Sequence, residues 1–200
     1  MKDKDTEKRI LQAAISVFQK KGMAGARMQE IADEANINKA MLHYYFRSKQ
    51  QLFEAVFMGA FAKLAPQLNL IFASEEPLFE KIEAFVSGYI DFIIENPFLP
   101  SFIIQELNNN PEFVNTFLSH QGRPNPVPFL KQIEGEISAG TIKRIHPKHL
   151  LIDLLSLCAF PFVAKSMLTV LLELPDGEFD RLMEERKTMI SQLIIENIKV

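Results

Sequence analysis

Apolar residues recur at helical spacing along nearly the whole chain, and this pattern restricts its possible folds more than any other feature. In the first segment, Ile10, Ala13, Ala14, Val17 and Phe18 follow the i, i+3, i+4, i+7, i+8 spacing of one helix face. Prolines 77, 97, 111, 147 and 175 stand at junctions between later segments, where a missing N–H costs least. No stretch combines alternating polarity with hairpin-turn residues. The sequence therefore predicts an all-α fold.

The first helix is expected to be capped by Thr6 and to end at Lys20, Lys21 and Gly22, with positive charge in its last turn and glycine beyond. Later helices are expected at about 78–95, 98–109, 111–119, 127–138, 148–174 and 178–199. Pro161 lies inside one of these segments, so we expect it to kink that helix.

Two short helices, at about residues 28–35 and 39–46, are predicted close together near the N-terminus. Asn36 stands at the turn between them, where a left-handed backbone is needed, and asparagine tolerates positive φ best after glycine. Asn38 can cap the second helix, whose Leu42 and Phe46 are one turn apart and face inward. Ile31 and Ala35 point inward from the first helix. This arrangement is typical of a helix-turn-helix.

The next helix begins with a capping box, in which Ser48 is followed three residues later by Gln51. It continues through the apolar residues Leu52, Phe53, Val56 and Phe57. Lys49 lies in its first turn, beside free backbone N–H groups and the positive end of the helix dipole. The sequence therefore predicts a phosphate-binding position at Lys49.

Charge is distributed unevenly along the chain, although the net charge is only −3. Residues 1–49 hold ten Lys/Arg and six Asp/Glu, which gives 10 − 6 = +4. Residues 50–200 hold twelve Lys/Arg and nineteen Asp/Glu, which gives 12 − 19 = −7. A basic N-terminal segment on an acidic body is expected when only one end of a protein meets phosphates.

The outward-facing residues of the second short helix have the chemistry of a DNA-reading surface. Lys39 can reach guanine edges or phosphate, Ala40 leaves room for close approach, and Met41 can pack on a thymine methyl. His43, Tyr44 and Tyr45 can donate hydrogen bonds to phosphate oxygens. We therefore expect this helix-turn-helix to bind double-stranded DNA.

The segment GMAGARMQEIADEANINKAMLHYYFRSKQQLFEAVF resembles the N-terminal domain of the TetR (tetracycline repressor)/AcrR-like family of transcription regulators. The resemblance covers residues 6–57. Arg27 stands where the family often has Ser or Thr, Asn36 replaces the usual turn glycine, and Ala40 and Met41 replace a common Gly-Thr pair. The DNA-contact positions that the resemblance implies are Arg27, Gln29, Asn38, Lys39, Ala40, Met41, His43, Tyr44, Tyr45 and Lys49.

The resemblance implies two domains, a helix-turn-helix DNA-binding domain at 1–50 and a helical effector-binding and dimerisation domain at 51–200. It also implies a homodimer that associates through the last two long helices. Apolar stripes run along both helices, although such stripes are by themselves more often intrachain core than an interface. On the earlier helix the stripe is Leu150, Leu151, Leu154, Leu155, Cys158 and Phe162; on the last it is Phe179, Leu182, Met183, Arg186, Met189, Ile190, Leu193, Ile194 and Asn197.

Aromatic residues are dense in the body, which suits a pocket for a small apolar or aromatic effector. The residues proposed to line it are Phe61, Phe85, Tyr89, Phe92, Phe102, Glu106, Phe129 and Phe160. The alternative is that the aromatic rings fill core. Asp91, Glu106 and Asp153 interrupt apolar runs and can orient a polar group, or they lie on the solvated sides of their helices.

Several other kinds of site are not expected. Cys158 is the only cysteine, which excludes an intrachain disulfide and indicates an intracellular, cytoplasmic protein. His146 and His149 lack a third ligand of matching pattern, so they indicate a capped helix start rather than a metal site. No Gly-rich phosphate loop, nucleophile elbow or histidine-carboxylate helix motif is present, so neither a cofactor nor enzyme activity is expected. The apolar stretch 150–174 is too polar to span a membrane.

Together these patterns predict a homodimeric, ligand-responsive repressor that binds a palindromic operator and leaves it when a small-molecule effector binds. An architectural DNA-binding protein without an effector is one alternative, although it would not need so large an aromatic-rich body. An enzyme in the body, with the N-terminal module as an accessory, is the other.

Overall fold

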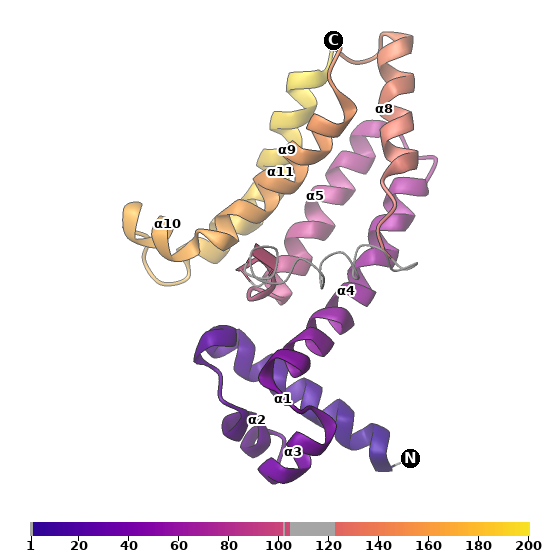
Figure 1. Cartoon of the computed structure of the whole chain (residues 1–200). Helices are drawn as coiled ribbons and strands as arrows, with labels where there is room; N and C mark the ends of the chain where they lie inside the picture. Colours follow the sequence, from indigo (N-terminus) through magenta and orange to yellow (C-terminus); the bar gives the residue numbers. More distant parts are fainter. Residues whose placement is uncertain (1, 102, 105–122) are drawn as a thin grey trace.

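The computed structural model describes residues 2–101, 103–104 and 123–200, which are helical apart from their connections. Figure 1 shows a small group of helices at one end of the molecule and a bundle of longer helices at the other. The first group contains α1 (Lys2–Gly25), α2 (Met28–Glu34), α3 (Lys39–Tyr45) and the start of α4 (Lys49–Ala73). The bundle contains the rest of α4 with α5 (Leu78–Glu95), α8 (Val127–Ala139), α9 (Pro147–Val163), α10 (Lys165–Leu171) and α11 (Glu178–Ile198). The all-α prediction is confirmed.

The first group, called the head below, encloses its own hydrophobic core. Phe18 of α1, Ile31 of α2, Leu42 of α3 and Leu52 of α4 are all fully buried in it. The ring of Phe18 lies 4.6 Å from that of Phe53, centroid to centroid. Each of the four helices therefore contributes at least one side chain that water does not reach, and this core fixes α3 relative to α1.

The start of α1 differs from the expectation. The helix begins at Lys2, so Thr6 lies inside it and does not cap it. Charged residues of good helix propensity, with acids near the positive end of the dipole, extend the helix toward the N-terminus. At the other end, Gly22 has φ 65° and ψ 176°, and it kinks the helix three residues before Gly25. The helix break expected at Gly22 is therefore confirmed.

Helix α4 belongs to both parts of the molecule. Its first half buries Leu52, Phe53, Val56 and Phe57 in the head core, and its second half buries Leu64, Leu68 and Phe72 in the bundle. The boundary expected at residue 50 thus falls in the first turn of a helix that continues into the bundle, called the body below.

The body is organised around α5, which packs most extensively against α11 and also against α4 and α9. Aromatic rings fill its centre: Phe72 of α4 lies 5.7 Å from Phe85 of α5 and 5.5 Å from Phe129 of α8. Near the C-terminus, Lys143 N–H donates to the carbonyl of Ile198 at 2.7 Å, within an isolated bridge between Ile142 and Lys199. This bridge ties the end of α11 to the loop before α9.

The segment 148–174 bends sharply, but the break lies at Ala164, three residues beyond Pro161, the position at which the sequence predicts the kink. Helix α9 contains Pro161 and ends at Val163, and α10 continues from it at an angle of 71°. Lys165 holds the start of α10 through an ion pair with Asp180 at 3.1 Å, and its ammonium lies 4.5 Å from the centre of the Phe179 ring. The expected helices at 98–109 and 111–119 fall mainly outside the described residues.

Among the described residues, one continuous helix, α4, is long and apolar enough to cross a membrane by length and composition alone. The bent pair of α9 and α10 meets the same criterion only if it is counted as one span. Seven apolar side chains of α4 are buried in the two cores described above, whereas Leu70 and Met58 are exposed.

Candidate DNA-binding site

The turn between α2 and α3 has the backbone that the sequence predicts. Asn36 adopts φ 53°, and its N–H donates to the carbonyl of Asp33 at 3.0 Å. The next residue, Ile37, donates to the carbonyl of Ala32 at 3.0 Å. These bonds close the C-terminus of α2 and reverse the chain within three residues. The left-handed turn at Asn36 is therefore confirmed.

Arg9 of α1 also holds this turn, a role that local sequence patterns did not reveal. Its guanidinium donates to the carbonyl oxygens of Ala35 at 2.6 Å and of Asn36 at 3.3 Å. Both carbonyls lie past the end of α2, where helical partners are absent. The arginine thus anchors the helix-turn-helix to α1 across 26 residues of sequence.

Helix α3 is capped at its start and buried along only one side. The side-chain oxygen of Asn38 accepts a hydrogen bond from Met41 N–H at 2.7 Å, as expected for an N-cap. Leu42 is fully buried in the head core, and Phe46 follows at its C-cap. The rest of the helix is therefore available to a partner.

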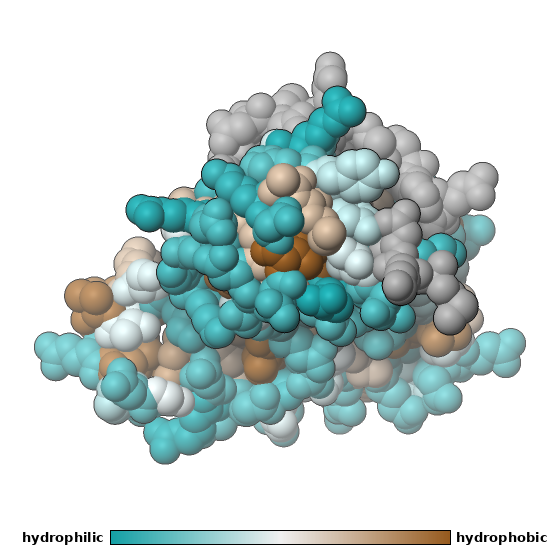
Figure 2. Space-filling view, turned by 90° about the horizontal axis from the view of Figure 1, so that it is seen from below, coloured by the Kyte–Doolittle hydropathy of each residue, from teal (hydrophilic) through white to brown (hydrophobic). Residues whose placement is uncertain are grey.

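The predicted reading residues lie on the open side of α3. Lys39, Ala40, Met41, His43 and Tyr44 are exposed, and the exposed fraction of Tyr44 is 79%. Tyr45 is half-buried, with its ring edge-on to that of Tyr44 at 5.5 Å. Figure 2 views the head from below and shows a largely hydrophilic face around a small hydrophobic patch. An exposed helix with a basic first residue, a large apolar side chain and two phenols fits base edges flanked by phosphates.

The two predicted contact residues at the start of α2 lie differently. Arg27 occupies the N-cap position without a side-chain capping bond and is exposed. The amide of Gln29 donates to Asp33 Oδ1 at 2.7 Å, one turn further along α2. Arg27 is therefore free to extend toward a ligand, whereas Gln29 is held along its own helix.

Lys49 follows the Ser48 cap of α4, and its ammonium already has protein partners. Nζ lies 3.0 Å from the carbonyl oxygen of Ala26 and 3.4 Å from that of Ala24. It therefore closes the loop between α1 and α2, while an ammonium has three donors and retains one for a phosphate. Ser48 Oγ accepts from Gln51 N–H at 3.1 Å, but the Gln51 side chain reaches Arg47 N–H rather than Ser48 N–H. Only half of the predicted capping box forms.

An ion pair and a hydrogen bond join α2, the first helix of the motif, to α1. Lys21 Nζ lies 2.9 Å from Oε1 of Glu30, and this hydrogen bond lowers the pKa of the Glu30 carboxyl. Ser16 donates to Glu34 at 3.0 Å on the same side. Two of the three carboxylates of α2 thus bond to α1, and the third, that of Asp33, accepts the bond from Gln29.

Of the predicted effector residues that the structure describes, five lie in or against the body core and one, Phe160, does not. Phe85 and Phe129 are fully buried in the body core, where Phe61, Tyr89 and Phe92 pack against it partly exposed. Burial raises the pKa of the Tyr89 phenol to about 12. Phe160 lies apart on α9 with 57% of its side chain exposed. Phe102 and Glu106 lie outside the described residues.

The predicted dimer stripes are divided between two sides of their helices. Leu150, Leu154, Cys158 and Phe162 of α9 are buried within the chain, as are Phe179, Met183, Ile190 and Ile194 of α11. On the other side, Leu155 is 37% exposed, Met189 48% and Leu193 56%, and the neighbouring Ile152 is 54% exposed. His146 caps the start of α9 by accepting from Lys148 N–H at 3.2 Å, which confirms the expected helix cap.

Comparisons with known proteins agree with this geometry. Residues 10–56 match the family model of bacterial regulatory proteins, tetR family. The transcriptional repressor NicS of Pseudomonas putida is 36% identical over 87 residues, which are 42% of this chain and 41% of NicS. IcaR of Staphylococcus aureus, a negative transcriptional regulator of the biofilm operon icaADBC, is 32% identical over 56% of each chain. The chain thus spans about half the length of the curated relatives it matches.

Solved structures extend the likeness to the whole fold. A transcriptional regulator of the TetR/AcrR family from Thermobifida fusca superposes with a TM-score of 0.64 at 16% identity, covering 96% of this chain and 97% of that one. Its likeness shows the fold alone. The family-model match is confined to residues 10–56, and the fold match continues through the body. Residues 10–56 of the chain thus match the TetR family of bacterial regulatory proteins, and the chain has the fold of a solved regulator described as TetR/AcrR.

Proposed function

We propose that this protein is a homodimeric transcriptional repressor that binds a palindromic DNA operator through α2 and α3 of each head. The single observation that carries the proposal is the open side of α3, where Lys39, Met41 and Tyr44 are exposed beside a rigidly held turn. The relatives NicS and IcaR are named as a repressor and a negative regulator. TetR-family regulators are not enzymes. We propose that this protein acts in the cytoplasm.

The residues of the head divide into two roles under this proposal. Arg27, Gln29, Asn38, Lys39, Ala40 and Met41 lie at the start of α2 and α3 and read base edges in the major groove. His43, Tyr44, Tyr45 and Lys49 bond to the phosphate backbone and set affinity on any sequence. The third donor of the Lys49 ammonium supplies its phosphate contact.

Dimerisation is proposed through α9 and α11. Their outward sides expose Ile152, Leu155, Met189 and Leu193, which together make an apolar face that a lone protomer leaves in water. A twofold interface buries the same patch of both protomers, so one continuous apolar face suffices. The two heads then meet successive major-groove faces of one DNA duplex.

The effector is proposed to be a small apolar or aromatic molecule bound in the body beside its aromatic residues. Such a ligand releases DNA only if it binds more tightly to a conformation in which the two heads no longer match the operator. The path to the heads is short, because Phe92 and Phe61 pack against both the head core and the body core.

The test is binding to promoter fragments that carry a palindrome, measured as a function of salt concentration. Each phosphate that a cationic side chain neutralises releases counterions, so affinity must fall steeply as salt increases. Binding to the palindrome that exceeds binding to a scrambled fragment, with this salt dependence, supports the proposal. Absence of binding, or affinity that does not change with salt, contradicts it.

A further inference from the structure

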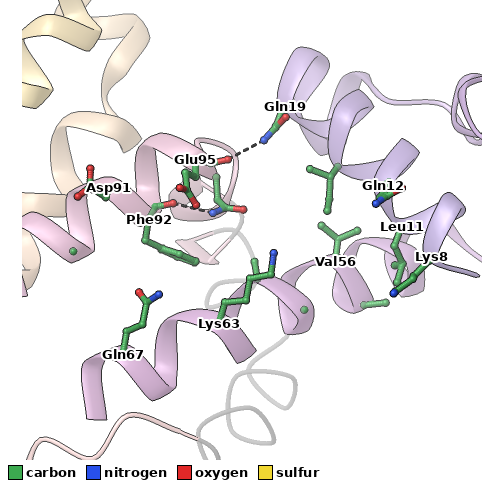
Figure 3. Close-up of a pocket in the computed structure, with 16 residues that line it drawn as sticks. Lys8, Leu11, Gln12, Gln19, Val56, Lys63, Gln67, Asp91, Phe92 and Glu95 are labelled. Carbon is green, nitrogen blue, oxygen red and sulfur yellow. Dashed lines mark hydrogen bonds between the residues drawn. The ribbon is translucent and has the colours of Figure 1, made fainter. Parts of the chain in front are cut away.

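A large groove lies where the head meets the body, outside the aromatic core of the body. It has a volume of about 790 Å³ and is walled by α1, α4 and α5 (Figure 3). Sites for small molecules in proteins commonly have volumes of about 300–1,000 Å³. Of the predicted effector residues that the structure describes, only Phe92 lines this groove. The groove is therefore a different candidate site, and nothing in the sequence patterns pointed to it.

Apolar side chains from all three helices line part of the groove. Leu11 and Ile15 of α1, Val56 of α4 and Phe92 of α5 all line the groove. Gly59 and Gly88 contribute no side chain, and a Cβ atom built on either would meet no atom within 4 Å. A helical glycine costs roughly 0.5–1 kcal/mol relative to alanine. At these two positions the missing side chains leave open space within the groove.

Charged groups of opposite sign line the same groove from different helices. Lys8 comes from α1 and Lys63 from α4, whereas Asp91 and Glu95 both come from α5, one turn apart. In Figure 3, the Lys63 side chain points from α4 into the space between the helices, and Lys8 lies at the end away from Asp91. Within the described residues, Lys8, Lys63 and Glu95 make no side-chain ion pair. The groove thus offers cationic groups on one side and anionic groups on the other.

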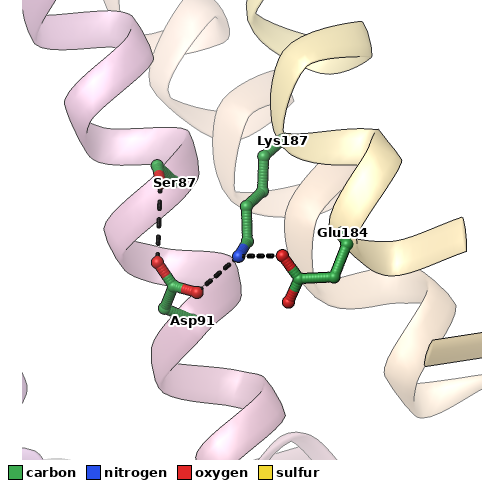
Figure 4. Close-up of polar contacts among 4 residues, drawn as sticks. All are labelled: Ser87, Asp91, Glu184 and Lys187. Carbon is green, nitrogen blue, oxygen red and sulfur yellow. Dashed lines mark hydrogen bonds and ion pairs between the residues drawn. The ribbon is translucent and has the colours of Figure 1, made fainter. Parts of the chain in front are cut away.

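One of these carboxylates already binds a lysine of the body. Asp91 accepts hydrogen bonds from Ser87 at 3.5 Å and from Lys187 of α11, which also bonds to Glu184 (Figure 4). These hydrogen bonds raise the pKa of Lys187 against the opposing effect of its burial, the largest single contribution. Asp91 is therefore already paired within its own chain, whereas no ion pair is described for Glu95, which lines the groove one turn further along α5.

From this geometry we propose that the groove binds a zwitterionic amphipathic small molecule. Its anionic group lies toward Lys63 and Lys8, its cationic group lies toward Glu95, and its apolar skeleton covers Val56 and Phe92. Side-chain amides of Gln12 and Gln67 supply further polar contacts. A ligand with a single charge pairs with the side chains of one sign only, so both charges are needed for full affinity.

A ligand in this position bridges the two parts of the molecule. One direct polar contact already crosses beside the groove, from Gln19 Nε2 of α1 to the carbonyl oxygen of Glu95 at 2.8 Å. A bound zwitterion adds contacts from α1 and α4 to α5 and so favours one orientation of the head. The effect of such a ligand on operator affinity rests on the proposed function, whereas its binding to the groove does not.

Calorimetric titration of the 200-residue chain with benzyldimethylammonium propanesulfonate tests the site. This probe carries a sulfonate, a quaternary ammonium and an aromatic ring; benzenesulfonate and benzyltrimethylammonium each retain one of its two charges. The zwitterion is expected to bind more tightly than either analogue. In the variant Gly59→Leu a side chain occupies the open space in the groove, and the zwitterion should bind at least about tenfold more weakly.

Gly135→Leu is the matched control, because Gly135 is also a helical glycine with open space at its Cβ but lies on α8 away from the groove. It should bind the probe like the parent protein. Lys63→Met and Glu95→Gln should each weaken binding by about two- to fivefold, since the charges they remove are exposed. Helical content of every variant is checked by circular dichroism, so that misfolding is not read as lost binding.

The outcomes separate this inference from the proposed function. Absence of probe binding, or equal binding by the parent and Gly59→Leu, overturns the site. Equal affinity for the zwitterion and its singly charged analogues overturns its chemistry. If the protein does not bind operator DNA, the proposed function fails while the titration still decides the site. If operator affinity is unchanged at saturating probe, the link between the site and the head is wrong.

Discussion

The ring of Phe98, which follows α5 of the body, lies edge-on to Phe53 in the head core, with centroids 5.5 Å apart. Phe98 also lies 6.4 Å from Phe18, and Leu99 beside it is buried in the same cluster. The head core is therefore completed by two residues, Phe98 and Leu99, that follow the C-terminus of α5. Stability of the head and its attachment to the body rest partly on the same side chains.

Phe98→Ala should lower the free energy of unfolding by about 3 kcal/mol, because it removes a buried ring and leaves a cavity between α1 and α4. Urea unfolding followed by circular dichroism measures this change. Leu70→Ala is the control, since Leu70 of α4 is 73% exposed and its truncation should change stability by less than about 0.5 kcal/mol. Equal effects of the two substitutions would show that Phe98 does not stabilise the head.

Lys39→Ala should relax the base preference at one operator position and cost about 1–3 kcal/mol there. Lys39 is the first residue of α3 and is exposed, so it can reach a base edge without moving the backbone. Tyr44→Phe removes a hydroxyl proposed to bond to phosphate and should weaken binding to all sequences alike. Affinities for a set of operators with single base changes separate the two patterns. A uniform loss with Lys39→Ala would exclude base reading by this lysine.

Lys49→Ala should reduce both DNA affinity and stability. The ammonium holds the carbonyl oxygens of Ala24 and Ala26, so its removal leaves them without this partner. If Lys49 also contacts a phosphate, the slope of log K against log salt becomes shallower by about 0.9. A loss of stability with an unchanged slope would limit Lys49 to holding the loop.

Leu193→Glu should convert a dimer to monomers. Leu193 lies on the outward side of α11 with 56% of its side chain exposed, so a charge there leaves the fold of one protomer intact and becomes costly only when a partner buries it. Sedimentation velocity gives the oligomeric state. Leu70→Glu introduces the same charge at an exposed position of α4 and should remain dimeric. A Leu193→Glu protein that stays dimeric would place the interface elsewhere.

Stability should fall in alkaline solution partly through Cys158. Burial raises the pKa of this thiol from about 9.0 to about 12, so the neutral form is the one that the folded chain accepts. A group whose pKa is higher in the folded chain than in the unfolded chain stabilises the fold fully at a pH below its unfolded pKa. This stabilisation is lost as the pH rises toward its folded pKa. Between these values the loss is about 1.4 kcal/mol for each pH unit.

Urea unfolding of the parent and of Cys158→Ala at pH 8 and at a pH near 10.5 tests this effect. Tyr89, whose pKa is raised to about 12 by burial and in part by Cys158 itself, remains in both proteins. The difference in stability between the two proteins should narrow at the higher pH. A constant difference would mean that the thiol ionises equally well in the folded and unfolded chain.

Features set by a few neighbouring residues could be predicted from the sequence. The left-handed Asn36, the Asn38 cap and the break at Gly22 all depend on local backbone preferences, and all are present. The bonds from Arg9 to Ala35 and from Lys49 to Ala26 join residues 26 and 23 positions apart, and only tertiary packing brings them together. For the same reason, the periodicity of α9 and α11 showed that both have apolar stripes but not which side the chain itself buries.

The groove between head and body lay beyond sequence reasoning for a related reason. Its walls come from α1, α4 and α5, and none of these helices shows a binding motif by itself. Lys63 and Glu95 each look like ordinary solvated charges along their own helices. Only the folded chain places them around one space.

Helix α4 is one continuous helix embedded in both cores, so a small tilt at one end becomes a larger displacement at the other. From Pro66 to Lys49 it rises by about 25 Å at 1.5 Å per residue. A tilt of about 5° at the body end therefore displaces the head end by about 2 Å. In a dimer with two copies of α4 the separation of the reading helices changes by up to twice that amount, against a half-site spacing of about 34 Å. A packing change too small to disturb either core is thus large enough to misalign hydrogen bonds to bases.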